Sequence, residues 1–310
     1  MAKGTRLVFG LQLLASVSSS LKRIAASVGL VAAALLLGCQ GGSAPAFTQL
    51  VEARRLADDL RIELAQASNA SDRAVMADTD RESIAFARDA EKATGAVALS
   101  AATLGARLQS LGYPAETRAL EEFSGHFAEY RQVDREVLDL AVQNTNLKAQ
   151  RLSFGPVREA ADQFHDALGA AAAATAPKDR CRVDGLVARA EMAVREIQIL
   201  QAPHIAEPEE ATMAKIEKEM AERQATARDA LKLLGWGAGP AIVKQLDVAR
   251  GALDRFDGLS AQLVGLSRRN SNVRSLALAL RRTPALVAAC DGSLAQLQDG
   301  LSKEGFSGTR

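Results

Sequence analysis

Two short polar stretches share the pattern N-[TS]-N-[LV]-[KR] and carry the side chains best suited to binding a ligand. They start at Asn144 and Asn270, 126 positions apart. Their polar members are Asn144, Thr145, Asn146 and Lys148 in the first stretch, and Asn270, Ser271, Asn272 and Arg274 in the second. An asparagine amide both donates and accepts hydrogen bonds, and a lysine or arginine pairs with a carboxylate. The pattern therefore indicates a candidate site for a polar ligand or a partner helix.

Two structural roles compete with ligand contact. Asparagine accepts the left-handed conformation that ends a helix, and Asn, Thr or Ser caps the helix that follows. Alternatively, buried amides form a polar layer that sets the register of a helical bundle. Such side chains commonly bond to nearby backbone, which favours the structural roles. We expect each motif to form a turn at the membrane-distal end, with Thr145, Asn146, Ser271 and Asn272 exposed and available for contact.

The residues that precede each motif predict the helices that position it. Apolar side chains recur in steps of three and four, which places them on one face of a helix. The two matching sets are Leu120, Phe123, Phe127, Tyr130, Val133, Val137, Leu140 and Leu246, Ala249, Leu253, Phe256, Leu259, Leu263, Leu266. Asn144 and Asn270 follow four residues after each set, on the buried stripe itself.

The whole chain has the composition of a helical protein. Aromatic residues make up 4% of the 310 residues, and only 8 are proline. A capping box at Thr79–Glu82 and the Gly112-Tyr113-Pro114 turn separate helices of roughly 30 residues joined by short loops, an up-down-up-down arrangement. Gly155-Pro156 is interpreted as a kink in the fourth helix. It could instead be the true turn, with the third helix running through the Asn motif.

We therefore predict an all-α fold with two tandem up-down-up-down four-helix bundles. The predicted segments are a signal peptide over 1–38, a lipidated Cys with a flexible tether over 39–46, bundle one over 47–174, a linker over 175–179, bundle two over 180–302, and a tail over 303–310.

The N-terminal leader indicates export and lipidation. Lys22-Arg23 precede an apolar run of about fifteen residues, too short to span a membrane but typical of a signal peptide. The run ends in Leu36-Leu37-Gly38-Cys39, which resembles a bacterial lipobox. We expect Cys39 to be lipidated and the protein to face the periplasm in the cell envelope. Gln40 slightly favours the outer membrane. The alternative is an uncleaved membrane anchor with an incidental Cys.

Charge and motifs narrow the classes of function. The net charge is +1, and removal of the four basic residues of the leader leaves 34 basic against 37 acidic residues, or −3. Nucleic acid is therefore not an expected partner. No catalytic triad pattern, phosphate-binding loop or HExxH motif occurs. We expect no enzymatic activity, no cofactor and no metal.

The histidines suggest a possible metal site, and the cysteines suggest a possible disulfide. If the chain reverses at Asn144, His126 and His165 reach similar heights on antiparallel helices. No Cys or carboxylate at ligand spacing supports a metal between them. A coincidence of two surface histidines is therefore favoured. An exported protein with two remaining cysteines could form a Cys181–Cys290 disulfide. The two helices are neighbours in the predicted bundle, although the heights of the thiols could differ by several turns.

Part of the sequence also resembles a known family of proteins. The pattern runs from Met76-Ala77-Asp78-Thr79-Asp80 through Leu120-Glu121-Glu122-Phe123 and Phe127-Ala128-Glu129-Tyr130 to Leu138-Asp139-Leu140-Ala141. It resembles the four-helix-bundle sensory domain of methyl-accepting chemotaxis receptors, over 47–174 and more loosely over 180–302. The resemblance implies a bundle outside the inner membrane that binds a small molecule, such as an amino acid or an organic acid. The receptors' second membrane span, HAMP-like segment and signalling hairpin have no counterpart after Leu301, so only the sensor-like module is implied.

Two functions follow as expectations. The first is a non-catalytic, membrane-anchored extracytoplasmic lipoprotein that binds a small molecule or a transmembrane receptor. The second is a structural or assembly spacer of the cell envelope with no small-molecule ligand.

Overall fold

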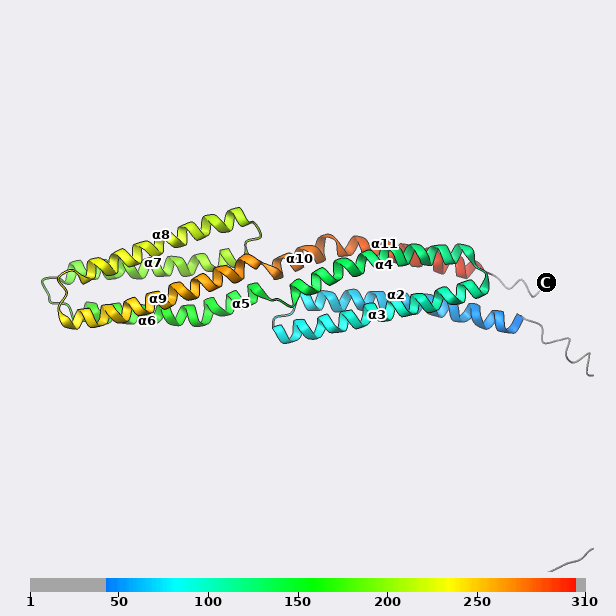
Figure 1. Ribbon diagram of the computed structural model, residues 1–310, viewed down its shortest axis with the longest axis horizontal. Coiled ribbons are helices and arrows are strands. Elements are labelled where there is room, and N and C mark those ends of the chain that lie inside the picture. Colours follow the sequence, from blue (N-terminus) through cyan, green and yellow to red (C-terminus); the bar gives the residue numbers. More distant parts are fainter. Residues whose placement is uncertain (1–42, 305–310) are drawn as a thin grey trace, which may run out of the picture. The chain divides into compact units, whose positions relative to one another are not determined.

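The computed structural model describes residues 43–304, and within that range every regular element is a helix and none is a strand (Figure 1). The all-α prediction is thus confirmed for this part of the chain. The elements are α2 (Ser43–Val75), α3 (Asp80–Leu111), α4 (Pro114–Ala141), α5 (Thr145–Leu152), the π-helix η1 (Ser153–Val157), α6 (Arg158–Ala173), α7 (Arg180–Ala206), α8 (Glu210–Gly235), α9 (Pro240–Arg269), α10 (Ser271–Arg281) and α11 (Thr283–Lys303).

The predicted ends of the chain are only partly described. The signal peptide over 1–38 and the lipidation site Cys39 lie outside the described residues. Helix α2 begins at Ser43, inside the predicted flexible tether over 39–46. From Glu52 onward, the described residues belong to one compact unit.

Predicted local signals at the ends of α3 are confirmed. The Glu82 amide donates to Thr79 Oγ1 (3.2 Å), which is the N-cap half of the predicted capping box, whereas the Glu82 carboxylate accepts from the Thr79 hydroxyl (2.8 Å). Gly112 takes the left-handed conformation (φ 71°), which glycine adopts without steric cost. Pro114 then opens α4, where its missing N–H costs nothing.

The Gly155-Pro156 irregularity lies inside a continuous helical segment, as the kink interpretation predicts. Pro156 falls within η1, between α5 and α6. A π-helical turn accommodates the hydrogen bond that proline cannot donate. The competing interpretation is wrong, because α4 ends at Ala141 and does not run through the Asn motif.

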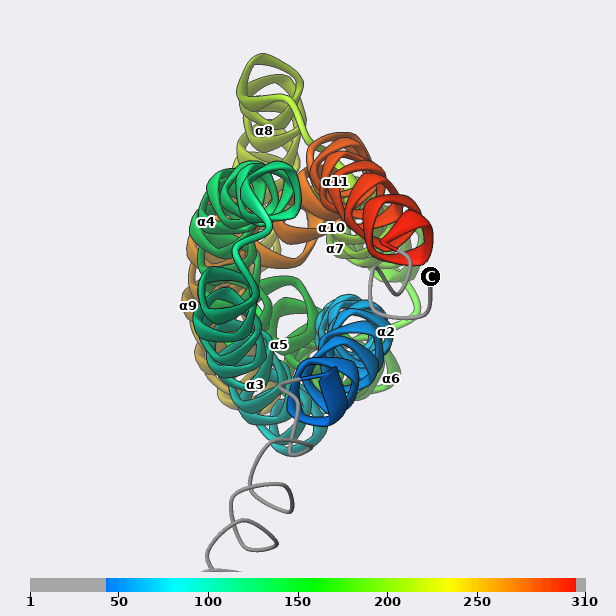
Figure 2. The same cartoon turned by 90° about the vertical axis from the view of Figure 1, so that its right-hand side faces the viewer.

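The helices do not pack in chain order. Helix α4 packs against α3, α10 and α11, whereas α5 and α6 pack against α9 and α7, and α7 pairs with α8. Ala70 and Ala74 of α2 share a cluster with Leu138 of α4. The first helix group therefore contains α2, α3, α4, α10 and α11, and the second contains α5 to α9 (Figure 1). The end view shows α4 beside α11 (Figure 2).

This pairing corrects the predicted division into a bundle over 47–174 and a bundle over 180–302. Each helix group takes helices from both halves of the chain, so 175–179 is a loop within the second group and not a linker between bundles. The physical reason is that neither Asn motif reverses the chain. Helix α4 is followed by α5, which leaves α4 and packs on α9, and α9 is followed by α10, which returns to α4.

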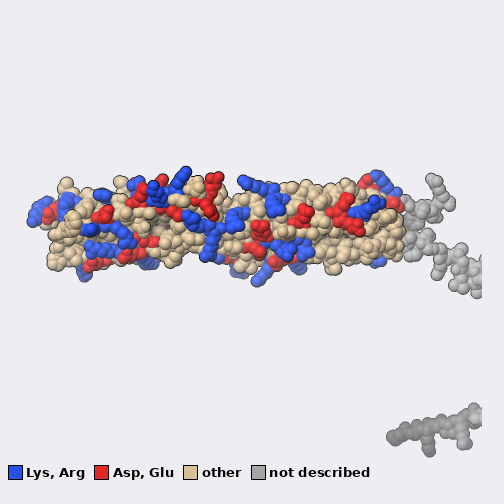
Figure 3. Space-filling model, turned by 45° about the horizontal axis from the view of Figure 1, so that its top comes forward, with Lys and Arg blue, Asp and Glu red and all other residues tan. Residues whose placement is uncertain are grey.

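The apolar stripes before the two motifs form much of the core. Every predicted member is buried except Leu259 and Leu266, which are partly buried. In α4, the rings of Phe123, Phe127 and Tyr130 stack at centroid distances of 5.6 and 5.9 Å. On the face shown in Figure 3, basic and acidic side chains are interspersed along the described surface.

Candidate functional site

The two Asn motifs lie side by side and cap each other's helices. The Thr145 amide donates to Ser271 Oγ (3.1 Å), and the Ser271 amide donates to Thr145 Oγ1 (3.0 Å). One residue on, the Asn146 amide donates to Asn272 Oδ1 (3.2 Å), and the Asn272 amide donates to Asn146 Oδ1 (3.1 Å). The first amides of a helix have no partner within that helix. Here α5 and α10 satisfy them reciprocally.

The motif amides also bind the second helix group. Asn146 Nδ2 donates to Asn270 Oδ1 (2.8 Å) and to the Ile205 carbonyl at the end of α7 (2.6 Å). Asn270 Nδ2 donates to the Glu207 carbonyl (2.8 Å), which holds the α7–α8 loop. Asn272 Nδ2 donates to Asn144 Oδ1 (2.9 Å). We call this set of contacts between residues 144–146 and 270–272 the motif crossing.

The predicted exposed turn is wrong, although the predicted helix break is confirmed. Asn144 and Asn270 both adopt the left-handed conformation, at φ 50° and 52°. Asn144, Thr145, Asn146, Asn270 and Ser271 are nevertheless buried, and Asn272 is half-buried. The crossing combines helix punctuation with a buried polar layer, because two helix breaks meet and must satisfy their free amides without water.

The cations of the motifs do not form a shared carboxylate clamp in this arrangement. Lys148 Nζ donates to the Gln143 carbonyl (2.8 Å) and lies 3.8 Å from Asp80. Arg274 is exposed. The polar side chains of the crossing bind mainly one another, which favours a structural role over the predicted ligand contact.

The cysteines and histidines do not come together as the tandem arrangement would require. Cys181 is exposed on α7 and Cys290 is buried on α11, and both thiols are free, so the structure does not contain the disulfide that was left open. Burial raises the pKa of the Cys290 thiol to about 12. His126 Nδ1 lies 3.2 Å from Ser293 Oγ, whereas His165 Nδ1 lies 2.9 Å from Glu191. Among the described residues, no cluster of three or more ligand residues could hold a metal.

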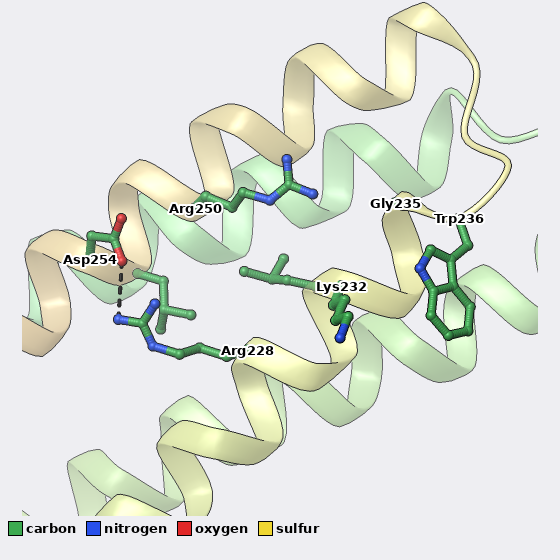
Figure 4. Close-up of a pocket in the computed structure, with 8 residues that line it drawn as sticks. Arg228, Lys232, Gly235, Trp236, Arg250 and Asp254 are labelled. Carbon is green, nitrogen blue, oxygen red and sulfur yellow. Dashed lines mark ion pairs between the residues drawn. The ribbon is translucent and has the colours of Figure 1, made fainter.

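A groove of about 440 Å³ lies between α8 and α9 (Figure 4). The guanidinium of Arg228 faces Asp254 (3.1 Å), and Arg250 pairs with Asp247 (2.7 Å). Arg250 lies so close to Gly235 that a Cβ atom there would come within 3.1 Å of its Nη2. Trp236 is exposed at the rim. Both arginines are paired with aspartates, and Lys232 is the remaining cation among the residues that line the groove.

A smaller cavity of about 240 Å³ lies among α7, α8 and α9, inside the second helix group. Its apolar wall consists of Ile197, Met220, Phe256 and Val264. Its polar wall consists of Glu217, Gln224, Asp257 and Ser260. We call it the α7–α9 cavity. Pockets for small molecules are typically apolar with a few convergent polar groups, and this cavity has that character.

Two carboxylates of the cavity wall are held differently. Glu217 accepts two hydrogen bonds from Arg268 (2.7 and 2.8 Å), and His204 Nε2 lies 2.9 Å away. These contacts with Arg268 and His204 lower the pKa of the Glu217 carboxyl despite burial. Asp257 accepts one short bond from Arg228 (2.6 Å). Burial raises its pKa above the ordinary value, although Gln224 and Arg228 oppose the shift.

Glu217 and Asp257 were not among the site residues predicted from the sequence. Asp257 directly follows Phe256 of the buried stripe, but helical periodicity places it at the edge of that stripe, where exposed residues are common. Ser260, a polar residue between Leu259 and Leu263, was a weak sequence signal of a polar wall at this point. Its match 126 positions earlier is Asp134, which is also buried.

Comparison with known proteins gave no match, whether with family models, with curated proteins or with solved structures. Within residues 43–304, no helix is both long and apolar enough to cross a membrane.

Proposed function

We propose that this protein is a non-catalytic lipoprotein of the bacterial cell envelope whose sensor-like helical bundles bind a small molecule. The observation that carries the proposal is the α7–α9 cavity, which combines an apolar wall with polar groups from two helices. The resemblance to chemotaxis sensory domains supports the same function. In this proposal, the protein would recognise a transmembrane receptor after it has bound its ligand.

A thermal-shift screen of the whole chain tests ligand binding. Amino acids, organic acids and small amines are the compounds to screen, since a ligand that binds only the folded state stabilises it by mass action. A ligand at 100 times its Kd adds about 2.7 kcal/mol, so we expect at least one class of compound to raise Tm in a concentration-dependent way. A flat response across all classes would favour the alternative function, a structural spacer of the envelope.

The lipid anchor is tested separately from the ligand. We expect mass spectrometry of the mature protein to find an acylated Cys39 at its N-terminus, because the charged leader, apolar run and Leu-Leu-Gly-Cys occur in order. Cys39→Ser should move the protein out of the membrane fraction, with Cys181→Ser as a matched control that leaves it there. An unmodified Cys39, or equal membrane association of the Cys39→Ser variant, would contradict the anchor.

A further inference from the structure

Asp257 carries a buried oxygen that the protein leaves without a hydrogen bond. Its side chain is only 9% exposed, and its Oδ2 accepts the bond from Arg228. Its Oδ1 is buried and makes no hydrogen bond of ordinary geometry within the described residues, although Gln224 lies close enough to lower the pKa of the carboxyl. A buried acceptor without a donor destabilises the folded state, and the cost is larger when the acceptor is charged. Because Asp257 lines the α7–α9 cavity, a donor in that cavity would remove the cost.

The charges around the cavity favour a cation over an anion. Arg228 is shared between Asp254 (3.1 Å) and Asp257 (2.6 Å), and Arg268 is committed to Glu217. These three carboxylates face two guanidiniums, and His204 Nε2 also lies 2.9 Å from Glu217, so the network holds one negative charge in excess when that imidazole is neutral. A negatively charged ligand would meet Asp257 and Glu217 on the wall with no free cation to receive it.

The size and the apolar wall of the cavity restrict the ligand further. Pockets for drug-sized ligands span about 300–1,000 Å³, and this cavity is smaller, at about 240 Å³. Phe256, Met220 and Ile197 offer apolar surface next to the acidic groups. An aromatic face such as that of Phe256 also attracts a cation. A small ligand with an aliphatic chain and a positively charged group matches this arrangement of apolar and acidic walls.

We propose that the α7–α9 cavity binds a small organic ammonium ion. The ammonium group donates to Asp257 Oδ1, and the hydrocarbon part packs against Phe256, Met220 and Ile197. Arg228 positions the Asp257 carboxylate through Oδ2 and leaves Oδ1 for the ligand. This inference rests on the proposed function of small-molecule binding and names the class of ligand.

Isothermal titration calorimetry with three probes of the same size tests the inference. The probes are n-butylammonium, 1-butanol and butyrate, which differ in charge but share a four-carbon chain. We expect n-butylammonium to bind at least tenfold more tightly than 1-butanol, and butyrate to bind most weakly. A charge-assisted hydrogen bond contributes about 1.5–3 kcal/mol, which corresponds to about tenfold or more in Kd.

Two matched variants locate the site. Asp257→Asn should weaken n-butylammonium binding at least tenfold, because it removes the charge that receives the ammonium group. Asp254→Asn should change Kd less than threefold, since Asp254 pairs with the same Arg228 but its side chain is 65% exposed and does not line the cavity. Circular dichroism confirms that each variant is folded. If Asp257→Asn does not fold, the probe ranking in the unmodified protein decides alone.

The outcomes separate this inference from the proposed function. Equal binding of the three probes, tightest binding of butyrate, or an unchanged affinity in Asp257→Asn would overturn the ammonium site and leave small-molecule binding in place. If none of the three probes binds but another compound raises Tm, the ammonium site is wrong and the proposed function stands. Failure of every compound in both assays would overturn both.

Discussion

Replacing Asn146 with alanine will lower the free energy of unfolding by about 3 kcal/mol or more, because two buried groups and one half-buried group lose their partner at about 1–3 kcal/mol each. These groups are the Ile205 carbonyl (2.6 Å), Asn270 Oδ1 (2.8 Å) and the Asn272 amide (3.1 Å). The effect is large because Asn146 joins both motifs and the end of α7 at one buried point. Denaturant unfolding followed by circular dichroism measures it.

Gln143→Ala is the matched control for this prediction. Gln143 lies three residues away and is exposed, and its side-chain amide bonds only to the Asp139 carbonyl within the same turn of helix. We expect it to change the free energy of unfolding by less than about 0.5 kcal/mol, as is usual for a surface substitution. Similar costs for the two variants would show that the motif crossing contributes little to stability.

The second large effect concerns Asp134, a carboxyl buried in the first helix group. Only 3% of the residue is exposed, and its Oδ1 has no partner among the described residues. Burial raises its pKa, while the neighbouring hydroxyls of Ser71 and Tyr130 oppose the shift and Asp72 adds to it. The folded protein therefore retains this proton at pH values where the unfolded chain has released it.

Stability should consequently fall as pH rises from the ordinary carboxyl value of 3.8 through the raised pKa of the folded state. Asp134→Asn removes this loss, because the amide keeps the shape but carries no charge. We expect the variant to be more stable than the parent at pH 7, by about 1–2 kcal/mol given the cost of an unsatisfied buried group. The difference should vanish below pH 3.8.

Denaturant unfolding of both proteins across this pH range measures the prediction. Asp139→Asn is the control, because Asp139 is exposed on the same helix. A variant less stable than the parent at pH 7, with the same dependence on pH, would mean that Asp134 is satisfied in its ionised form.

Much of the fold was predictable from local chemistry. The N-cap at Thr79, the left-handed Gly112 and the proline at the start of α4 act within a few residues of sequence, so their effect does not depend on partners. The helical break at Asn144 and Asn270 has the same origin. The candidate cavity was not predictable, because its walls come from α7, α8 and α9 and no single segment contains it.

The sequence by itself determined that this chain is helical, which faces of its helices are buried, and where the helices break. Only the tertiary structure decided that α4 pairs with α11 and α6 with α9, and that the duplicated motifs meet and cap each other. The reason is physical. Apolar periodicity identifies the face that must leave water but not the helix that will cover it, and a left-handed residue breaks a helix without specifying whether the chain reverses or continues.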